Sequence, residues 1–339
     1  MERTALVTGA TGYIAKHVVQ QLLAAGWHVR ASMRDPGRAD EVLRAVTPTG
    51  GDVGAEARLS SLTLDLTSDT GWRAAMEGVD ALVHTASPFP LRQPKNPEDA
   101  IRPAVDGTRR ALTAAREAGV KRAVVTSSIV AMMNGTPKDG RAFGPEDWSA
   151  TEGPMATPYL ISKTLAEREA WRLAGEDGAP ALTVLNPGLV VGPPLDRRYG
   201  TAVQVIERIV RGKDPALPPL GFPTVDVRDV AAAHVRALDR DGSVGRRIPV
   251  AAGFLWMPEM AKAIAAALPG RRIATRRAPG WLIRAVALVD PAVKSVLPNL
   301  NRRDEVETRT AEEVLGLRMR DPMAAVVDTA RWLDREGLA

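Results

Sequence analysis

A tyrosine and a lysine, Tyr159 and Lys163, are four residues apart in the segment TPYLISKTLAE, residues 157–167. On a helix, residues at this spacing lie on one face, so the two side chains can share a site. A free phenol has a pKa of about 10 and is a poor acid or base near neutrality. A nearby ammonium favours the phenolate and lowers that pKa, so the pair could transfer a proton. Taken alone, the pattern is an ordinary polar helix face.

A serine at the end of a buried strand strengthens the catalytic interpretation. The segment RAVVTSS, residues 122–128, is typical of such a strand. Ser128 would then project from the carboxyl edge of a parallel sheet, where ligands bind in α/β proteins. A strand-end serine is more often a helix cap or part of a turn. Beside a tyrosine it could also steady a substrate oxygen as charge develops.

A glycine-rich turn, VTGATGYIA, occupies residues 7–15, between an apolar strand and an apolar-periodic helix. Glycines here allow a tight turn and let a pyrophosphate approach backbone amides at the helix N-terminus. The alternative is an ordinary strand–helix turn, since one glycine motif is a weak signal. We favour dinucleotide binding because the turn follows the first strand. The predicted contacts from this turn are Gly9, Thr11, Gly12, Tyr13 and Ile14.

The end of the second strand, RASMRDP, residues 30–36, bears on the choice between NAD and NADP. An NAD site usually places an acid here for the ribose 2′-hydroxyl, whereas an arginine suits a 2′-phosphate. Met33 stands at that position, and Arg34 follows it, with Arg38 nearby. NADP is therefore favoured over NAD. Asp35 keeps NAD possible, and a surface Arg–Asp pair is the structural alternative.

Two further strand ends could contact the same dinucleotide. Asp65 and Leu66 end the third strand, and the carboxylate could accept a hydrogen bond from an adenine amino group or cap the next helix. The fourth strand ends in small residues that would let a flat cofactor pass over the sheet edge, although small residues also simply pack. These residues are Thr85, Ala86 and Ser87.

The elements that must position these residues alternate between strand and helix. Strands are expected at 4–9, 28–34, 58–66, 80–87, 122–128 and 181–187, with a helix from 13 to 26 that Gly26 can close. A second helix is expected from about 97 to 118, with Pro103 as a kink or a late start, and a third should begin at Thr157 and Pro158. This alternation predicts an α/β fold with a Rossmann-type doubly wound parallel sheet.

Beyond Pro187 the alternation weakens. Residues 192–200 and 212–223 read as Pro/Gly-rich loops, 225–240 as a helix and 246–253 as a late strand, and the rest is mostly helical. We therefore expect a dinucleotide-binding domain formed by residues 1–188 and 224–253. Residues 189–223 and 254–339 should form a smaller, mostly helical substrate-binding lobe.

Composition argues against several classes of protein. The 339 residues include no cysteine, and four histidines form no close-spaced pair, so no metal site is expected. The chain carries a net charge of +5, but its arginines alternate with acids, as in NRRDEVE at 301–307, which indicates a solvated surface and no nucleic-acid partner.

Nothing in the sequence indicates export or a membrane. No signal peptide is recognised, and the apolar stretch 281–289 is too short to span a bilayer. That stretch is expected to be buried in a core, and a cytoplasmic monomer or homodimer is expected.

Several motifs occur together and in order: VTGATGYIA, VRASMRDP, LDL, HTASP, VVTSS, YLISKTLAE, NPGLVVGP and VRDVAAAHVRAL. As an ensemble they resemble the extended short-chain dehydrogenases/reductases of the NAD-dependent epimerase/dehydratase superfamily, in particular the dihydroflavonol-reductase-like branch. The resemblance covers most of residues 4–240.

The resemblance implies specific roles. Ser128, Tyr159 and Lys163 become the catalytic trio, in which Tyr159 gives a proton to a substrate carbonyl oxygen as hydride leaves the nicotinamide. Lys163 would hold the nicotinamide ribose and lower the pKa of Tyr159. Pro187 and Val190 would contact the nicotinamide end, and Arg34 the 2′-phosphate.

One departure from the branch concerns the substrate. Plant reductases carry a substrate-binding asparagine five residues after the serine, whereas this chain has Met133 there and Asn134 next. An apolar pocket is suggested by Phe89, Met132, Met133, Tyr199 and Phe222, although each could be core. The expected activity is NADPH-dependent reduction of an apolar aldehyde or ketone. The alternatives are a nucleotide-sugar epimerase or dehydratase of the same fold, and a non-catalytic NADP-sensing regulator.

Overall fold

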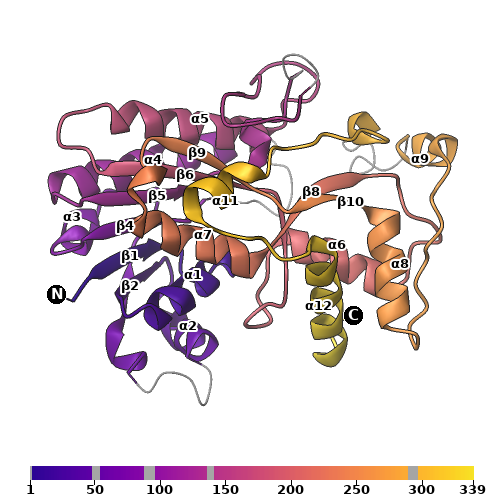
Figure 1. The fold of residues 1–339 in the computed structure, drawn as a ribbon, viewed down its shortest axis with the longest axis horizontal. Helices are drawn as coiled ribbons and strands as arrows, with labels where there is room; N and C mark the ends of the chain where they lie inside the picture. Colours follow the sequence, from indigo (N-terminus) through magenta and orange to yellow (C-terminus); the bar gives the residue numbers. More distant parts are fainter. Residues whose placement is uncertain (1, 48–53, 88–95, 136–140, 289–296) are drawn as a thin grey trace.

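The larger of two sheets is parallel and forms the centre of the molecule (Figure 1). The computed structural model describes residues 2–47, 54–87, 96–135, 141–288 and 297–339. In spatial order the strands are β3 (Leu59–Thr63), β2 (His28–Met33), β1 (Thr4–Thr8), β4 (Ala81–His84), β5 (Arg122–Thr126), β6 (Ala181–Pro187) and β9 (Arg246–Val250). The strand order reverses between β1 and β4, and ligands of doubly wound sheets bind at this reversal. The predicted fold class is confirmed.

Helices cover both faces of this sheet, and the side chains of β1 alternate between them (Figure 1). Ala5 and Val7 belong to a core cluster with α1 (Tyr13–Ala24), α2 (Ala39–Val46) and α7 (Val227–Asp239). Leu6 points to the opposite core, formed with α3 (Trp72–Met76), α4 (Glu98–Glu117) and α5 (Pro158–Ala174). Strands buried on both faces read as continuous apolar runs, as the sequence of β1 does.

Local signals for the helix ends are confirmed at α1 and α5. Thr157 caps α5, because its Oγ accepts from the Leu160 N–H at 3.2 Å, and Pro158 is the first helical residue. Gly26 adopts a left-handed φ of +82° just after α1 ends. α4 begins at Glu98 and runs through Pro103, so the predicted late start at that proline is wrong.

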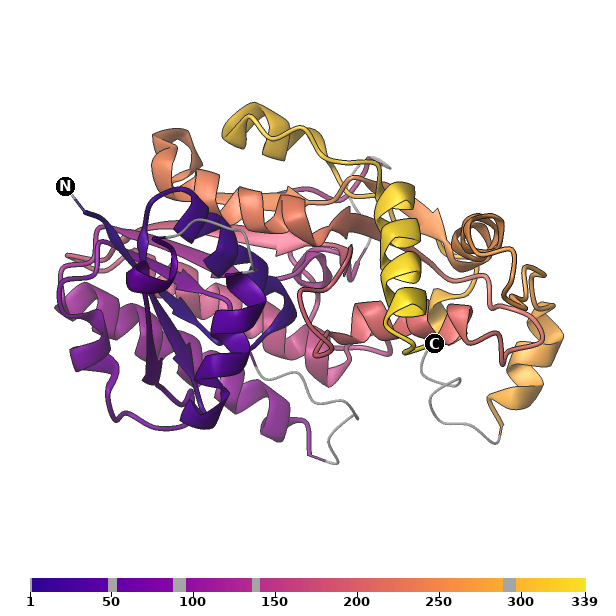
Figure 2. The same ribbon diagram turned by 90° about the horizontal axis from the view of Figure 1, so that it is seen from below.

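A second, three-stranded sheet lies beside the first (Figure 2). It has the order β10 (Gly253–Trp256), β8 (Gly221–Asp226) and β7 (Leu189–Val191), and only β10 is antiparallel to its neighbour. Around it pack α6 (Thr201–Val210), α8 (Met257–Ala267) and α12 (Pro322–Arg335). The mostly helical lobe thus contains strands, and the loop predicted to end at Pro223 is wrong for the residues that begin β8. The division into two domains stays a prediction, and two of its boundaries fall inside β8 and β10.

The C-terminal part of the chain packs against both sheets. α11 (Arg309–Leu315) packs against α7 and β9 of the large sheet, and α12 then returns to the smaller lobe. Near α9 (Gly280–Val286), Ile283 and Ala287 are buried, but Trp281 is 70% exposed and Leu288 86% exposed. The predicted burial of residues 281–289 is therefore wrong for Trp281 and Leu288. Within the described ranges, no helix is long and apolar enough to cross a membrane.

Three of the four histidines are buried and uncharged near neutrality. Burial lowers the pKa of His84 to about 3, and those of His17 and His234 to about 4. His84 Nδ1 is hydrogen-bonded to the Thr8 hydroxyl at 2.9 Å, and His234 Nδ1 to the Val230 carbonyl at 2.7 Å. No group of three potential metal-binding side chains occurs among the described residues.

Candidate active site

The end of β5 and the first turn of α5 bring Ser128 and Tyr159 together. Ser128 begins a short 3₁₀ turn, Ile129–Ala131, and its Oγ accepts from the Val130 N–H at 3.3 Å. The Ser128 hydroxyl is also hydrogen-bonded to the phenol of Tyr159. The serine and tyrosine that the sequence singled out therefore occupy one site.

Lys163 lies one turn further along α5 and is also buried. Its Nζ donates to the Thr126 carbonyl at 3.5 Å. Burial lowers the pKa of Lys163 to about 8, although the Glu167 carboxylate acts in the opposite direction. Burial raises the pKa of Tyr159, and the hydrogen bond from Ser128 partly offsets this rise. Near neutrality this leaves a protonated phenol beside a largely protonated lysine.

One cavity of about 760 Å³ connects Ser128 and Tyr159 to the glycine turn. Eight of the predicted catalytic and cofactor-binding residues line the cavity: Gly9, Gly12, Tyr13, Ile14, Thr85, Ser128, Tyr159 and Val190. Eight others do not line it: Thr11, Arg34, Asp65, Leu66, Ala86, Ser87, Lys163 and Pro187. Its volume is in the range of cavities that hold cofactors and drug-sized ligands.

The glycine turn needs glycine at its first position. Gly9 has a φ of +68°, and a Cβ there would lie 3.0 Å from the Cα of Ala86. Gly12 is the cap residue of α1 and has no side chain that could accept a hydrogen bond from the N–H groups of the first turn. Tyr13, Ile14 and Ala15 of that turn line the cavity, and a helix N-terminus without a capping side chain is an arrangement that suits a phosphate.

Two predicted contacts use their side chains within the protein. The Tyr13 hydroxyl donates to the Gly192 carbonyl at 2.7 Å, so only its ring and backbone face the cavity. The Thr85 hydroxyl donates to the Thr8 carbonyl at 2.6 Å, and the Thr8 hydroxyl accepts from the Ala86 N–H at 3.1 Å. These bonds fix the chain after β4 against the glycine turn.

The charged residues after β2 and β3 have separate roles. Arg34 is exposed and is close enough to Asp65 to lower its pKa slightly. Asp35 caps a turn, since its Oδ1 accepts from the Gly37 N–H at 3.0 Å, and Arg38 is paired with Glu41. Of the two basic residues proposed near the 2′-phosphate, Arg34 is therefore the better placed.

Asp65 does not cap the following helix α3. Its Oδ1 accepts from the N–H and the hydroxyl of Thr67, at 2.8 and 2.7 Å, and these bonds are the main cause of its lowered pKa. Of the two alternatives for Asp65, the helix cap is thus wrong, and the carboxylate forms a local turn. At the end of β6, Pro187 is buried, and the next residues, Gly188, Leu189 and Val190, line the cavity.

Much of the cavity lining is apolar. Met133, Tyr199 and Phe222 belong to it, as predicted. Met132 is buried in the core instead, so its assignment to the pocket is wrong, and Phe89 lies outside the described residues. The sequence missed Met155 and Phe254, which are also part of the apolar lining.

An ion pair from the distant segment 299–304 also lines the cavity. Arg302 and Asp304 both line the cavity, together with Asn299, and the Arg302 Nε donates to Asp304 Oδ1 at 2.7 Å. Interpreting 301–307 as plain solvated surface is therefore wrong for these two residues. No local signal could have identified them, because a tertiary contact brings them to the site.

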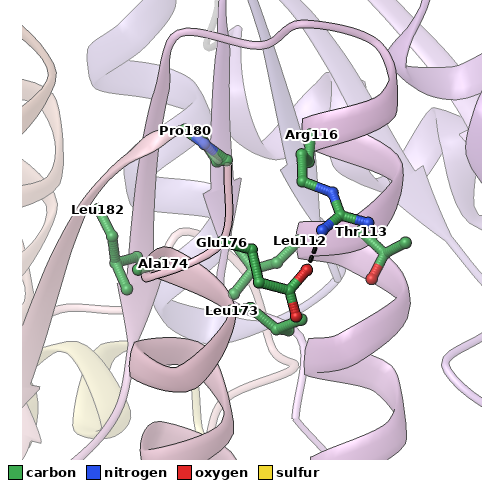
Figure 3. Close-up of a pocket in the computed structure, with 8 residues that line it drawn as sticks. All are labelled: Leu112, Thr113, Arg116, Leu173, Ala174, Glu176, Pro180 and Leu182. Carbon is green, nitrogen blue, oxygen red and sulfur yellow. Dashed lines mark hydrogen bonds and ion pairs between the residues drawn. The ribbon is translucent and has the colours of Figure 1, made fainter. Parts of the chain in front are cut away.

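A second hollow, between α4 and α5, is too small to matter for catalysis (Figure 3). It is lined by apolar side chains such as Leu112, Leu173 and Leu182, and an ion pair between Arg116 and Glu176 borders it. Its volume of about 10 Å³ has room for about one water molecule. Of these two cavities, only the large one has room for a cofactor or a substrate.

Comparison with known proteins agrees with this geometry. Residues 5–251 match the model of the NAD dependent epimerase/dehydratase family. Cinnamoyl-CoA reductase 1 of Arabidopsis thaliana is 37% identical over 248 residues, which cover 72% of this chain and 69% of that protein. Tetraketide alpha-pyrone reductase 2 of the same plant is 35% identical over 249 residues, or 72% of this chain and 76% of that protein.

A solved structure extends the similarity to the whole chain. The crystal structure of yeast methylglyoxal/isovaleraldehyde reductase Gre2 complexed with NADPH has a TM-score of 0.80 and 25% identity, covering 99% of this chain and 100% of that one. The similarity therefore includes the smaller lobe, where the sequence motifs are weakest. The family resemblance predicted from the motifs is confirmed: this chain belongs to the NAD dependent epimerase/dehydratase family.

Proposed function

We propose that the protein is an NADPH-dependent reductase that transfers hydride reversibly to the carbonyl of a small or medium apolar aldehyde or ketone. One observation carries the proposal. The hydrogen-bonded pair of Ser128 and Tyr159 lines a single cavity together with the glycine turn and several apolar side chains. Reductases among the relatives, one of them bound to NADPH, support it.

The described residues fit a bound dinucleotide. The N-terminus of α1, without a capping side chain, suits its pyrophosphate, and Gly9 permits close approach where a side chain would clash. Arg34 would pair with the 2′-phosphate, and Val190 would face the nicotinamide. When bound, the cofactor supplies the hydride.

The protein's own residues would handle the proton. The Tyr159 hydroxyl donates its proton to the carbonyl oxygen as that oxygen becomes an alkoxide. The Ser128 hydroxyl, already hydrogen-bonded to Tyr159, steadies the same oxygen. Lys163, as an ammonium next to the phenol, favours the phenolate that remains. In alcohol oxidation the same proton returns to Tyr159.

The lining indicates an uncharged substrate. Met133, Met155 and Phe222 present apolar surface, and the charge of Arg302 is neutralised by Asp304. A carboxylate or phosphate on the substrate would have to compete with Asp304 for Arg302. An apolar carbonyl compound needs no such exchange, and this argues against a nucleotide sugar.

The test is a turnover screen of the purified protein with NADPH or NADH. The panel should contain neutral aliphatic and aromatic aldehydes and ketones, charged keto acids, coenzyme A thioesters and nucleotide sugars. We expect oxidation of NADPH with the neutral carbonyl compounds. Binding of NADPH without turnover on any of them would favour a sensor, and conversion of a nucleotide sugar alone would favour an epimerase or dehydratase.

A further inference from the structure

Close to Ser128, Tyr159 and Lys163 lies a buried carboxylate that the proposed reaction does not use. Glu167 is only 1% exposed and follows Lys163 by one turn of α5. Tyr159, Lys163 and Glu167 therefore share one face of the helix. A carboxylate this deeply buried is stable as an anion only when it is paired and hydrogen-bonded.

The partners of Glu167 belong to the strand ends that form the site. Oε2 of Glu167 accepts from the Asn186 Nδ2 at 2.8 Å and from the Ser127 hydroxyl. Asn186 Nδ2 also donates to the carbonyl of Ser128 at 3.2 Å. One carboxylate thus connects α5 to the end of β5, next to the catalytic serine, and to the end of β6.

The other carboxylate oxygen holds a buried arginine. Oε1 of Glu167 accepts from the Arg247 Nε on β9 at 2.5 Å. The Nη1 of Arg247 donates to the carbonyls of Pro145 and Asp147 at 2.8 and 2.6 Å, and its guanidinium stacks on the Trp148 ring at 3.7 Å. Arg247 is therefore held from three directions, so its charge cannot swing toward Lys163.

The charged and titratable groups near Lys163 come from three elements. Glu167 and Tyr159 lie on its own helix, neutral His84 is on β4, and Arg247 on β9 faces Glu167 from the far side. Burial alone disfavours the ammonium form of Lys163, and Glu167 is the charge that favours it. Removal of that carboxylate would leave two buried cations in the same cluster.

We propose that Glu167 is a positioning residue: its carboxylate holds the strand end that carries Ser128 and keeps Lys163 in the charged form that supports Tyr159. This inference rests on the proposed function. It makes Glu167 an electrostatic part of the site, beyond any contribution to folding.

The decisive variant is Glu167→Gln, which preserves side-chain shape and removes the charge. The measurement is the pH dependence of alcohol oxidation with NADP⁺, which requires the Tyr159 phenolate. Without Glu167, Lys163 loses its proton at lower pH and supports the phenolate less. The midpoint of the rising activity should therefore move up by about 0.5–1 pH unit.

Arg247→Met provides the opposite test. Removal of this cation leaves the Glu167 charge less neutralised, so Lys163 holds its proton to higher pH and the midpoint should move down. The matched control is Asp229→Asn, since Asp229 is a buried carboxylate on α7, away from the cavity, that accepts from the Arg320 N–H at 2.7 Å. The Asp229→Asn variant should be less stable than the wild type, but its pH midpoint of alcohol oxidation should not shift.

The inference is wrong if Glu167→Gln folds and keeps the wild-type midpoint, or if both variants shift it in the same direction. If Glu167→Gln does not fold, Arg247→Met decides: a lower midpoint supports the inference and an unchanged one overturns it. An active Tyr159→Phe variant would overturn the proposed function itself. An inactive Tyr159→Phe combined with unshifted midpoints would overturn only the role of Glu167.

Discussion

Burial acts on Tyr159 and Lys163 in opposite directions. It raises the pKa of the phenol and lowers that of the ammonium to about 8. Near pH 7 the phenol keeps its proton and the lysine is largely charged, which suits donation to a carbonyl oxygen. Lys163 loses its proton above about pH 8, which removes the charge that favours the Tyr159 phenolate, so carbonyl reduction should slow there.

The first prediction concerns the proton donor. Tyr159→Phe should lower carbonyl reduction by about 10²-fold or more, because no other group on that helix face replaces the phenol. NADPH binding, followed by fluorescence titration, should persist. Tyr199→Phe is the matched control, since Tyr199 lines the same cavity but donates to Glu207, and it should retain turnover. Wild-type rates in Tyr159→Phe would rule out this role.

The second prediction concerns cofactor choice. Arg34→Ala should reduce the ratio of kcat/KM for NADPH to that for NADH by about ten- to a hundredfold, since a charge-assisted bond to the 2′-phosphate is lost. Arg38→Ala is the control, because Arg38 is already paired with Glu41 at 2.7 Å. A preference for NADH in the wild type, or an equal loss in both variants, would contradict the assignment.

At the scale of elements, the turn between β1 and α1 gives the third prediction. Gly9→Ala introduces a Cβ that would meet Ala86, at a residue whose φ is +68°. Gly26→Ala introduces the same backbone strain at a φ of +82° with nothing nearby. Each should cost about 1–2 kcal/mol in the free energy of unfolding. Only Gly9→Ala should also weaken NADPH binding, by about tenfold or more, as measured by calorimetry.

Elements defined by local patterns were predictable from the sequence, and elements defined by long-range pairing were not. The strand before Gly9 and the cap at Thr157 follow from neighbouring residues alone. β8 begins with Gly221 and contains Pro223, residues that usually disfavour strands, and it forms because β7 and β10 supply partners. Arg302 and Glu167 likewise gain their roles from residues far away in the sequence, such as Gly135 and Arg247.

At the scale of the whole molecule, the site is completed by a segment near the C-terminus. Asp304 neutralises Arg302 in the lining of the cavity. Asp304→Asn should therefore raise kcat/KM for a carbonyl substrate with a carboxylate tail by about tenfold, while neutral substrates change little. Glu305→Gln, whose partner Arg303 is exposed, is the control. Equal effects on charged and neutral substrates would show that Arg302 does not face the substrate.

Acid stability is also a property of the whole molecule. His17, His84 and His234 have folded pKa values of about 4, 3 and 4, below the ordinary 6.5. Between pH 6.5 and about pH 4 the unfolded chain binds protons that the folded one does not, so stability is lost as the pH falls. Urea unfolding at pH 7 and pH 5 should show this loss. His84→Asn should make it shallower, whereas the partly exposed His28→Asn should not.

The position of β9 also has a consequence for biosynthesis. This strand pairs with β6, register Pro187 with Val250, yet the small sheet's β7 and β8 are translated in between. On the ribosome, the edge of β6 stays unpaired until residue 250 has emerged, and such an edge is prone to pair with other chains. Closing this long loop is slow relative to local helix formation. The nascent chain must therefore protect an open sheet edge while β7 and β8 are still being made.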